Sequence, residues 1–243
     1  MDLSVGILGA GVLGTSLKEI YSNSTFIYRK PSQIVLDTQF DVVLVCAPSG
    51  LKWFANQHPE QDYKSVCDLI QLIDKIKASR FILVSTIDCI AAKYDTKNHY
   101  GANRRILEKY ILNKERGSVV RFGALIAPFI KKNFLHDIKI RNHRYLPNRK
   151  SSFQFSNLYN MEELFKEIIA FEFEIFNCFS EPVILNDLFD AIKDEARSAF
   201  FNDSNKVVNY NYHNNNDLDR LIILNQNFNS FSACSESVQK YLE

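Results

Sequence analysis

Six residues near the start of the chain have a spacing suited to binding phosphate. Residues 9–14 read GAGVLG, which matches the pattern G-x-G-x-x-G, between the apolar run 5–8 and a segment of helical periodicity. In that context the first glycine permits a tight turn, the second admits a pyrophosphate and the third lets the helix pack on the strand. The helix N-terminus then faces the anionic phosphates. The predicted dinucleotide-binding residues of this loop are Gly9, Gly11, Val12, Leu13 and Gly14.

The end of the next apolar run bears on which dinucleotide is bound. A protein selective for NAD usually has an acidic residue there for the ribose hydroxyls. In this chain the run ends in Tyr28, Arg29 and Lys30. Because two cations suit a 2′-phosphate, Arg29 and Lys30 favour NADP (NADPH) over NAD as the cofactor. The alternative interpretation is that both are solvated charges at the end of a strand.

A hydroxyl, a phenol and a guanidinium group occur together further along the chain. The apolar run 80–85 ends at Ser85 and Thr86 follows it, which places hydroxyls at the carboxyl edge of the sheet, where ligands bind in open α/β folds. Tyr100 and Arg104 are one helical turn apart and share a face. Such a set polarises a carbonyl and passes it a proton during hydride transfer, and a nearby cation lowers the pKa of the tyrosine.

With these residues the chain resembles the extended short-chain dehydrogenase/reductase family, particularly its nucleotide-sugar epimerases, dehydratases and 4-keto-reductases. The family motif is Ser or Thr followed by Tyr-x-x-x-Lys, and the resemblance covers most of the chain. It implies that Thr86 is the reactive hydroxyl, with Ser85 beside the cofactor, and that Tyr100 is the general acid/base. Arg104 occupies the place of the lysine that binds the nicotinamide ribose. The chain departs from the family here, because a guanidinium is always charged and does not relay a proton.

A literal Tyr-x-x-x-Lys also occurs ten residues later, at Tyr110 and Lys114, and its distance from Thr86 is closer to the usual family spacing. Two observations favour Tyr100. The family's tyrosine helix usually carries a glutamate eight residues after the tyrosine, which Glu108 matches after Tyr100. A helix that began at Tyr110 would also have only about eight residues before the predicted strand at 118–122, which is too short for the fold. The choice of Tyr100 implies that the loop after Thr86 is shorter than is usual in the family. The glycine loop also departs from the family, because it is one residue shorter than the usual form.

Three further stretches fit the same resemblance. The residues after the third parallel strand, Cys46, Ala47 and Pro48, resemble the loop that passes beside the adenine and ribose. Lysines at 131 and 132 lie where these enzymes begin the lobe that contacts the substrate nucleotide, and they suit a diphosphate as point charges; a solvated basic loop is the alternative. A polar residue between two phenylalanines at 153–155 is placed to contact the same ligand. The predicted substrate-binding residues are Lys131, Asn133 and Gln154.

The elements that must position these residues follow from apolar periodicity. Short apolar runs bounded by turn residues alternate with segments of helical spacing. The predicted strands are 5–8, 25–28, 42–46, 80–85 and 118–122, and the predicted helices are 13–22, 63–78 and 100–113. This alternation predicts an α/β fold, a Rossmann-type doubly wound parallel sheet. We expect an NAD(P)-binding domain at 1–125 and a smaller C-terminal substrate-binding lobe at 126–243, with a helix at 161–169 and a return strand near 171–179 that joins the sheet.

Composition excludes several classes of protein. The chain has 243 residues, 46% of them hydrophobic, which is enough for a packed core. Its 29 basic and 28 acidic residues give a net charge of +1, so we expect neither nucleic acid nor a membrane as a partner. No apolar run approaches the length of a membrane span and no signal peptide is evident, so a cytoplasmic location is expected. The five cysteines lack the spacing of a disulfide framework or a metal site, and the Asn-rich stretch 209–216 predicts exposed loop.

The resemblance implies NADPH-dependent reduction of a keto group on a nucleotide-activated deoxysugar, in polysaccharide or deoxysugar biosynthesis, with a nucleoside-diphosphate sugar as substrate. One alternative is a nucleotide-sugar epimerase or dehydratase, which recycles its cofactor in each turnover; the short chain favours the reductase. Another alternative is a non-catalytic NADP-binding sensor or scaffold. Arg104 supports this alternative because it stands where the family has its lysine. The oligomeric state stays open, with a homodimer as a candidate because the family often pairs helices such as 63–78 and 100–113.

Overall fold

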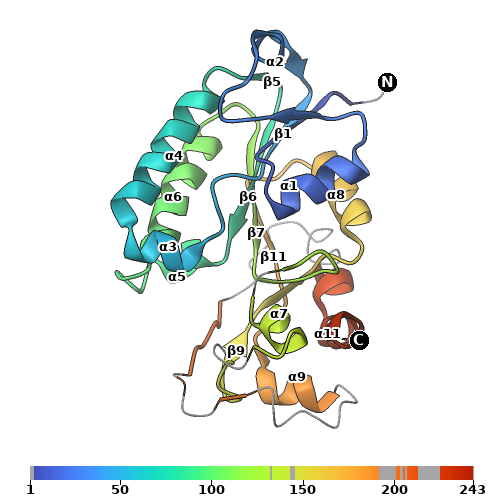
Figure 1. Ribbon diagram of the computed structural model, residues 1–243. Coiled ribbons are helices and arrows are strands. Elements are labelled where there is room, and N and C mark those ends of the chain that lie inside the picture. Colours follow the sequence, from blue (N-terminus) through green and yellow to red (C-terminus); the bar gives the residue numbers. More distant parts are fainter. Residues whose placement is uncertain are drawn as a thin grey trace. The chain divides into compact units, whose positions relative to one another are not determined.

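The computed structural model describes residues 3–131, 133–142, 146–191, 201–202, 205, 207–212 and 225–242. The chain divides into two compact units (Figure 1). Unit 1 comprises Met1–Arg121 and Phe165–Phe176, and unit 2 comprises Phe122–Leu164 and Asn177–Glu243. Lys132 and residues 213–216 of the Asn-rich stretch lie outside the described residues.

Unit 1 is built on a six-stranded sheet with the strand order β11-β7-β6-β4-β1-β2. Its strands are β1 (Val5–Leu8), β2 (Thr25–Ile27), β4 (Val42–Val45), β6 (Phe81–Thr86), β7 (Gly117–Phe122) and β11 (Ile175–Cys178). β1 pairs in parallel with β2 and β4, and β4 pairs in parallel with β6. Every residue of β1 and β4 is buried, as expected for strands covered on both faces. The predicted Rossmann-type sheet is confirmed.

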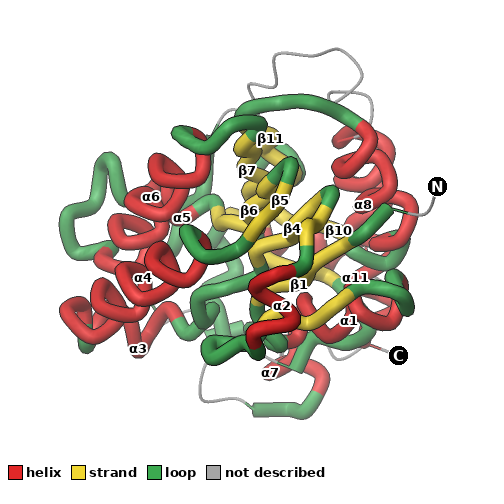
Figure 2. Tube along the Cα trace, turned by 90° about the horizontal axis from the view of Figure 1, so that it is seen from above, coloured by secondary structure: helices red, strands yellow, loops and turns green. Residues whose placement is uncertain are grey.

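Helices cover both faces of this sheet, as Figures 1 and 2 show. One face carries α3 (Lys52–Gln57), α4 (Pro59–Ile73), α5 (Asp88–Ala91) and α6 (His99–Leu112). The other carries α1 (Val12–Ile20) and α8 (Met161–Ala170). A short helix, α2 (Gln33–Asp37), follows β2. The arrangement is the two-sided covering that alternating strands and helices predict.

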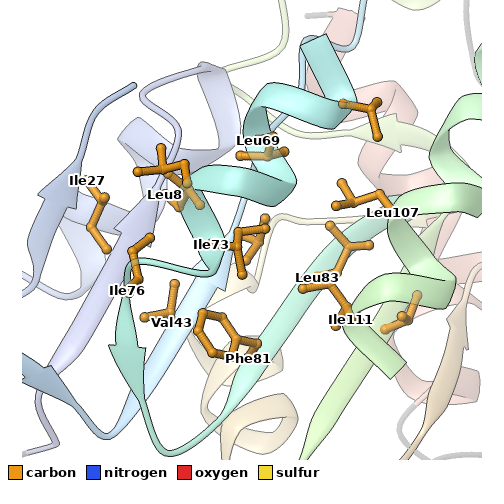
Figure 3. Packing of buried hydrophobic residues seen from close by; sticks show 14 of the residues in the cluster. Leu8, Ile27, Val43, Leu69, Ile73, Ile76, Phe81, Leu83, Leu107 and Ile111 are labelled. Carbon is orange, nitrogen blue, oxygen red and sulfur yellow. The ribbon is translucent and has the colours of Figure 1, made fainter. Parts of the chain in front are cut away.

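The main core of unit 1 lies between the sheet and the pair α4 and α6 (Figure 3). Leu69 and Ile73 of α4 and Leu107 and Ile111 of α6 pack against the strands. The strand side chains of this cluster include Leu8, Ile27, Val43, Phe81 and Leu83. Because these helices are fixed by apolar packing, polar residues at the start of α6 have defined positions at the sheet edge.

The structure corrects the predicted helix at 63–78. The helix α4 begins at Pro59 and ends at Ile73, and Lys77–Ala78 instead forms the short strand β5, which pairs in parallel with β3 (Gln39–Phe40). Proline is favourable in the first turn of a helix because its missing N–H has no partner there, which explains the early start. The short helices α2, α3 and α5 were not predicted, because four to six residues are too few to show helical periodicity.

Unit 2 contains two small sheets and its own apolar core. β8 (Ala124–Ile126) pairs in parallel with β10 (Phe155–Asn157), and β9 (Ser152–Phe153) pairs antiparallel with β12 (Val183–Ile184). Its helices include α7 (Phe134–Lys139), α9 (Leu185–Ala191) and α11 (Phe231–Leu242), which pack around buried side chains such as Phe155 and Leu188. All five cysteines of the chain are free thiols. Within the described residues, no helix is long and apolar enough to cross a membrane.

Candidate functional site

The glycine loop connects β1 to α1 and leaves space beside Gly11. Gly9 has φ of 109°, in the region that favours glycine, and a Cβ on Gly14 would lie only 1.9 Å from the Gly9 carbonyl oxygen. Around Gly11, the residue that precedes α1, a Cβ would meet no atom within 4 Å. A helix N-terminus with an open glycine in front of it is suited to an anion. The residues present therefore fit the pyrophosphate of a dinucleotide.

This loop lies where the strand order of the sheet reverses. From β1 the chain passes to β2 on one side and then to β4 on the other, and ligands bind at the carboxyl ends of strands around such a point. Cys46 follows β4, and its backbone N–H donates to the Leu8 carbonyl at 2.8 Å. A Cβ on Gly9 would lie 3.1 Å from the Ala47 Cβ. The structure thus brings the predicted loop of Cys46, Ala47 and Pro48 next to the glycine loop.

The two cations after β2 are near the same edge. Arg29 and Lys30 are exposed, and the Gly9 N–H donates to the carbonyl of Ile27, the last residue of β2, at 3.3 Å. Among the described residues, neither cation forms an ion pair. Their charges are therefore available to an anionic group on a ligand.

At the end of β6, an aspartate holds the Thr86 hydroxyl. Thr86 Oγ1 donates to Asp88 Oδ2 at 3.3 Å and accepts from the Asp88 backbone N–H at 3.2 Å. The other carboxylate oxygen, Asp88 Oδ1, lies 2.5 Å from Lys52 Nζ and 3.3 Å from Asn98 Nδ2. Asp88 is buried, and its contacts fix the last hydroxyl of the strand at the sheet edge.

Tyr100 lies in the first turn of α6, directly against this aspartate. A Cβ on Gly101 would be 2.0 Å from the Asp88 carbonyl oxygen, so the helix packs closely on α5. The Asn98 side chain caps α6 by accepting from the Gly101 N–H at 3.0 Å, and the Tyr100 N–H donates to Asn56 Oδ1 at 2.9 Å. The structure thus brings Tyr100 close to the Thr86–Asp88 pair.

The phenol of Tyr100 is a weaker acid than an ordinary tyrosine. The side chain is 9% exposed, and burial raises its pKa to about 12. The charges of Arg104 and Lys52 lower the pKa, whereas those of Asp88 and Cys89 raise it. The predicted effect of Arg104 has the expected direction, but burial outweighs it. The Tyr100 hydroxyl has no hydrogen-bond partner among the described residues.

Arg104 is held between α4 and α6 by a buried ion pair. Its Nη1 lies 2.7 Å from Asp62 Oδ2 and its Nη2 lies 2.9 Å from Asp62 Oδ1, while Nη2 also donates to the Ser49 carbonyl at 2.7 Å. The guanidinium carbon is 4.4 Å from the centroid of the Tyr100 ring. Arg104 therefore orients the tyrosine ring and anchors α4; its contact with a nicotinamide ribose stays a prediction.

Ser85 points away from Thr86, toward a second buried charge. Its hydroxyl donates to Glu108 Oε1 at 2.6 Å, and Arg121 binds both oxygens of the same carboxylate, with Nε at 2.8 Å and Nη2 at 2.6 Å. Glu108 is 3% exposed and ties α6 to β6 and β7. The Ser85 hydroxyl is thus engaged inside unit 1, and its contact with a cofactor stays a prediction.

The alternative pair, Tyr110 and Lys114, lies at the other end of β6. Lys114 Nζ is 2.7 Å from Asp74 Oδ1, to which the Tyr110 hydroxyl also donates. The Lys114 ammonium is 5.8 Å from the ring centroid of Phe81, the first residue of β6, whereas Thr86 is the last. This pair is therefore remote from the carboxyl edge of the sheet, which favours Tyr100.

The three predicted substrate residues lie in unit 2, and two of them are engaged in its own structure. Asn133 caps α7: it accepts from the His136 N–H at 3.0 Å and donates to the Leu125 carbonyl at 2.8 Å. Gln154 is 1% exposed and exchanges two hydrogen bonds of 2.8 Å with the backbone of Tyr212. Lys131 is exposed. Of the three, Lys131 is the exposed one, Asn133 is half-buried and Gln154 is buried.

Three charged residues of this site were not predicted from the sequence. Lys52 belongs to the short helix α3, which carried no periodic signal. Asp62 is paired with a residue of another helix, and no local spacing reveals such a pair. Asp88 is two residues after the predicted Thr86 and could have been assigned a role from its position alone.

Neither a protein-family model nor a curated protein sequence matches the chain. Solved structures match it over nearly its whole length. A UDP-galactose 4-epimerase has a TM-score of 0.67 at 12% identity, covering 99% of this chain and 98% of that one. A dTDP-4-dehydrorhamnose reductase from Bacillus anthracis, in complex with NADP, has a TM-score of 0.66 at 14% identity with the same coverage. TunA, an NAD-dependent NDP-hexosamine 5,6-dehydratase, has a TM-score of 0.68 at 11% identity, covering 99% of this chain and 97% of that one. The chain therefore has the fold of the extended short-chain dehydrogenase/reductase enzymes, as its sequence predicted.

Proposed function

We propose that the chain is an NADPH-dependent reductase of a keto group on a nucleotide-activated sugar. The observation that carries the proposal is the gathering of Thr86, Asp88 and Tyr100 at the carboxyl edge of the sheet that also carries the open glycine loop. A hydroxyl and an unengaged phenol at that edge suit proton donation to a carbonyl oxygen. The substrate class follows from the resemblance and from the described activity of a similar structure, the dTDP-4-dehydrorhamnose reductase.

The cofactor would be held by residues that surround the reversal point of the sheet. The glycine loop and the N-terminus of α1 would bind the pyrophosphate, and Arg29 and Lys30 would bind the 2′-phosphate. The loop that begins at Cys46 would lie beside the adenosine. When bound, NADPH supplies the hydride that reduces the keto carbon.

The residues of the chain then handle the proton. Tyr100 would donate its phenolic proton to the substrate oxygen as that oxygen becomes an alcohol, and the Thr86 hydroxyl would turn its hydrogen from Asp88 to the same oxygen. A phenol whose pKa is about 12 stays protonated at neutral pH, which is the form that reduction requires. Arg104, against the ring, would keep the phenol oriented. In unit 2, Lys131 is the proposed contact to the substrate diphosphate.

The cofactor preference is tested by calorimetric titration of the full chain with NADPH and with NADH. We expect tighter binding of NADPH. Replacing Arg29 and Lys30 with alanine should weaken NADPH binding by about tenfold or more, which corresponds to about 1.4 kcal/mol, and leave NADH binding unchanged. Tighter binding of NADH by the wild type would overturn the assignment of NADP.

The reaction is tested by following the loss of NADPH absorbance with a panel of 4-keto-6-deoxy nucleotide sugars. We expect turnover of at least one of them and a loss of about 100-fold or more in Tyr100→Phe, with NADPH affinity retained as the control. Cofactor retained through purification, with no net oxidation of NADPH, would instead favour an epimerase or dehydratase.

The ion pair between Arg104 and Asp62 favours one further candidate, a non-catalytic NADP-binding protein. That candidate would be supported if no substrate were reduced despite tight NADPH binding.

A further inference from the structure

A lysine that the proposed reaction does not use is linked through Asp88 to Thr86. Lys52 Nζ is 2.5 Å from one oxygen of the Asp88 carboxylate, and Thr86 Oγ1 donates to the other at 3.3 Å. We propose that Lys52 and Asp88 form a positioning pair for the site, which holds the Thr86 hydroxyl at the sheet edge and in which the Lys52 ammonium acts together with Arg104 to promote proton donation by Tyr100. This inference rests on the proposed function and names the residues that tune its acid.

The short helix α3 places Lys52 toward the start of α6. Lys52 and Asn56 are one turn apart and share a face of α3. The Asn56 side chain accepts the backbone N–H of Tyr100 at 2.9 Å, so this face of α3 contacts the first turn of α6. Asp88 reaches the same turn, because its carbonyl oxygen lies against Gly101. Lys52, Asp88 and Tyr100 therefore belong to one cluster.

Arg104 and Lys52 have different surroundings. Both terminal nitrogens of Arg104 bind the buried Asp62, and the guanidinium contacts the ring of Tyr100. The side chain of Lys52 is 40% exposed, and its ammonium binds Asp88, which also accepts from the Thr86 hydroxyl. Lys52 is therefore the cation that connects the charges near Tyr100 to the hydroxyl at the end of β6.

The charges near Tyr100 predict the direction in which each substitution should shift the pKa of this residue. Arg104 of α6 and Lys52 of α3 favour the phenolate, whereas Asp88 and Cys89 of α5 oppose it. Lys52→Gln should therefore raise the pKa of Tyr100, and Asp88→Asn should lower it. Both substitutions break the same ion pair. A pair with a purely structural role would make the two variants change the pKa in the same direction, so opposite shifts identify the electrostatic role.

The pKa of Tyr100 can be followed in the full chain without cofactor by ¹⁹F NMR after labelling with 3-fluorotyrosine, whose ring fluorine lowers every phenol pKa into a more accessible range. The Tyr100 resonance is assigned by its loss in Tyr100→Phe. We expect a higher pKa in Lys52→Gln, a lower one in Asp88→Asn, and a value close to that of the wild type in Lys52→Arg, which keeps the charge. Lys93→Gln, which removes an exposed lysine from the same unit, is the matched control and should leave the pKa unchanged.

The reductase assay gives a second readout. Lys52→Gln should lower kcat about threefold to tenfold with little change in KM, and Lys52→Arg should restore it. Shifts of the Tyr100 pKa in the same direction for Lys52→Gln and Asp88→Asn, or no shift in Lys52→Gln, would overturn the inference. Failure of the proposed function is recognised separately, by the absence of NADPH oxidation in the wild type, because the NMR titration uses the protein alone.

Discussion

At the scale of single residues, two glycines of one loop have opposite surroundings. The position of a Cβ on Gly14 is filled by the backbone of Gly9, whereas the position of a Cβ on Gly11 is open. Gly14 is needed for close packing of α1 on the loop, and Gly11 keeps room for a ligand. Stability and binding therefore depend on different glycines.

Alanine substitutions should separate these two roles. Gly14→Ala is expected to destabilise the fold by about 2 kcal/mol or more, because the backbone must move to admit the methyl group. Gly11→Ala should change stability by less than about 1 kcal/mol but weaken NADPH binding at least about tenfold. Urea denaturation and calorimetric titration of both variants provide the measurements. Equal effects of the two substitutions on stability would contradict this assignment.

The acidity of Tyr100 makes a prediction about pH. Because burial raises its pKa to about 12, the phenol stays protonated through neutral and mildly alkaline pH. We expect the kcat/KM of keto-sugar reduction to show no loss from Tyr100 ionisation in that range, while the reverse oxidation, which needs the phenolate, accelerates as pH rises. Initial rates in both directions across a pH series test this. A fall in the reduction rate near neutral pH that disappears in Tyr100→Phe would instead mean a lowered pKa.

At the scale of elements, buried ion pairs join the helices to one another and to the sheet. Asp62 of α4 binds Arg104 of α6, and Glu108 of α6 binds both Ser85 of β6 and Arg121 of β7. Bidentate arginine–carboxylate pairs constrain orientation as well as distance. These pairs therefore set the rotation of α6, and with it the position of Tyr100 at the sheet edge.

Removing one member of the Asp62–Arg104 pair should cost more than removing both. Arg104→Leu leaves Asp62 as a buried carboxylate without its cation, and we expect a loss of about 3–5 kcal/mol in the free energy of unfolding. Asp62→Leu combined with Arg104→Leu should be less destabilised than Arg104→Leu alone, since no buried charge is left uncompensated. Urea unfolding of the wild type and of these variants measures both values. Additive losses would show that the two residues do not act as a pair.

At the scale of the whole molecule, the two compact units do not follow the chain in order. Unit 1 takes Phe165–Phe176 from the second half of the sequence, which includes part of α8 and the first residues of β11. β11 is the neighbour of β7 in the central sheet, and the buried guanidinium of Arg80 donates to the carbonyl of Ile169 in α8 at 2.8 Å. A division at residue 125 separates these partners, and the roles of the two units in binding cofactor and substrate stay predictions.

A chain that ends at residue 125 is therefore expected not to fold cooperatively. It would lack β11 and α8, leaving an edge of β7 unpaired and Arg80 without its carbonyl partner. Circular dichroism during urea unfolding, together with NADPH titration, tests this against the full chain. Adding residues 161–178 back through a flexible linker should restore a cooperative transition. If the chain ending at 125 unfolded as sharply as the full chain, the division expected from the sequence would hold instead.

Much of the sheet was predictable because its signals are local. Buried strands appear as short apolar runs, and β1, β2, β4, β6 and β7 lie within one or two residues of their predicted positions. The predicted end of α4 was wrong. Ile76 continues the apolar spacing of the helix, but Lys77 and Ala78 pair with Gln39 and Phe40, a contact between distant segments. The short helices α2, α3 and α5 were missed for lack of periodicity.

Local sequence was enough to predict the glycine loop, the alternation of strands and helices, and the one-turn spacing of Tyr100 and Arg104, because each depends on residues a few positions apart. Which charges surround Tyr100 depends on the tertiary fold. It paired Arg104 with Asp62 and Lys52 with Asp88, and it placed Lys114 at the far end of β6 from Thr86. The physical reason is that such pairs join residues of separate elements, whose approach is set by how the helices pack on the sheet.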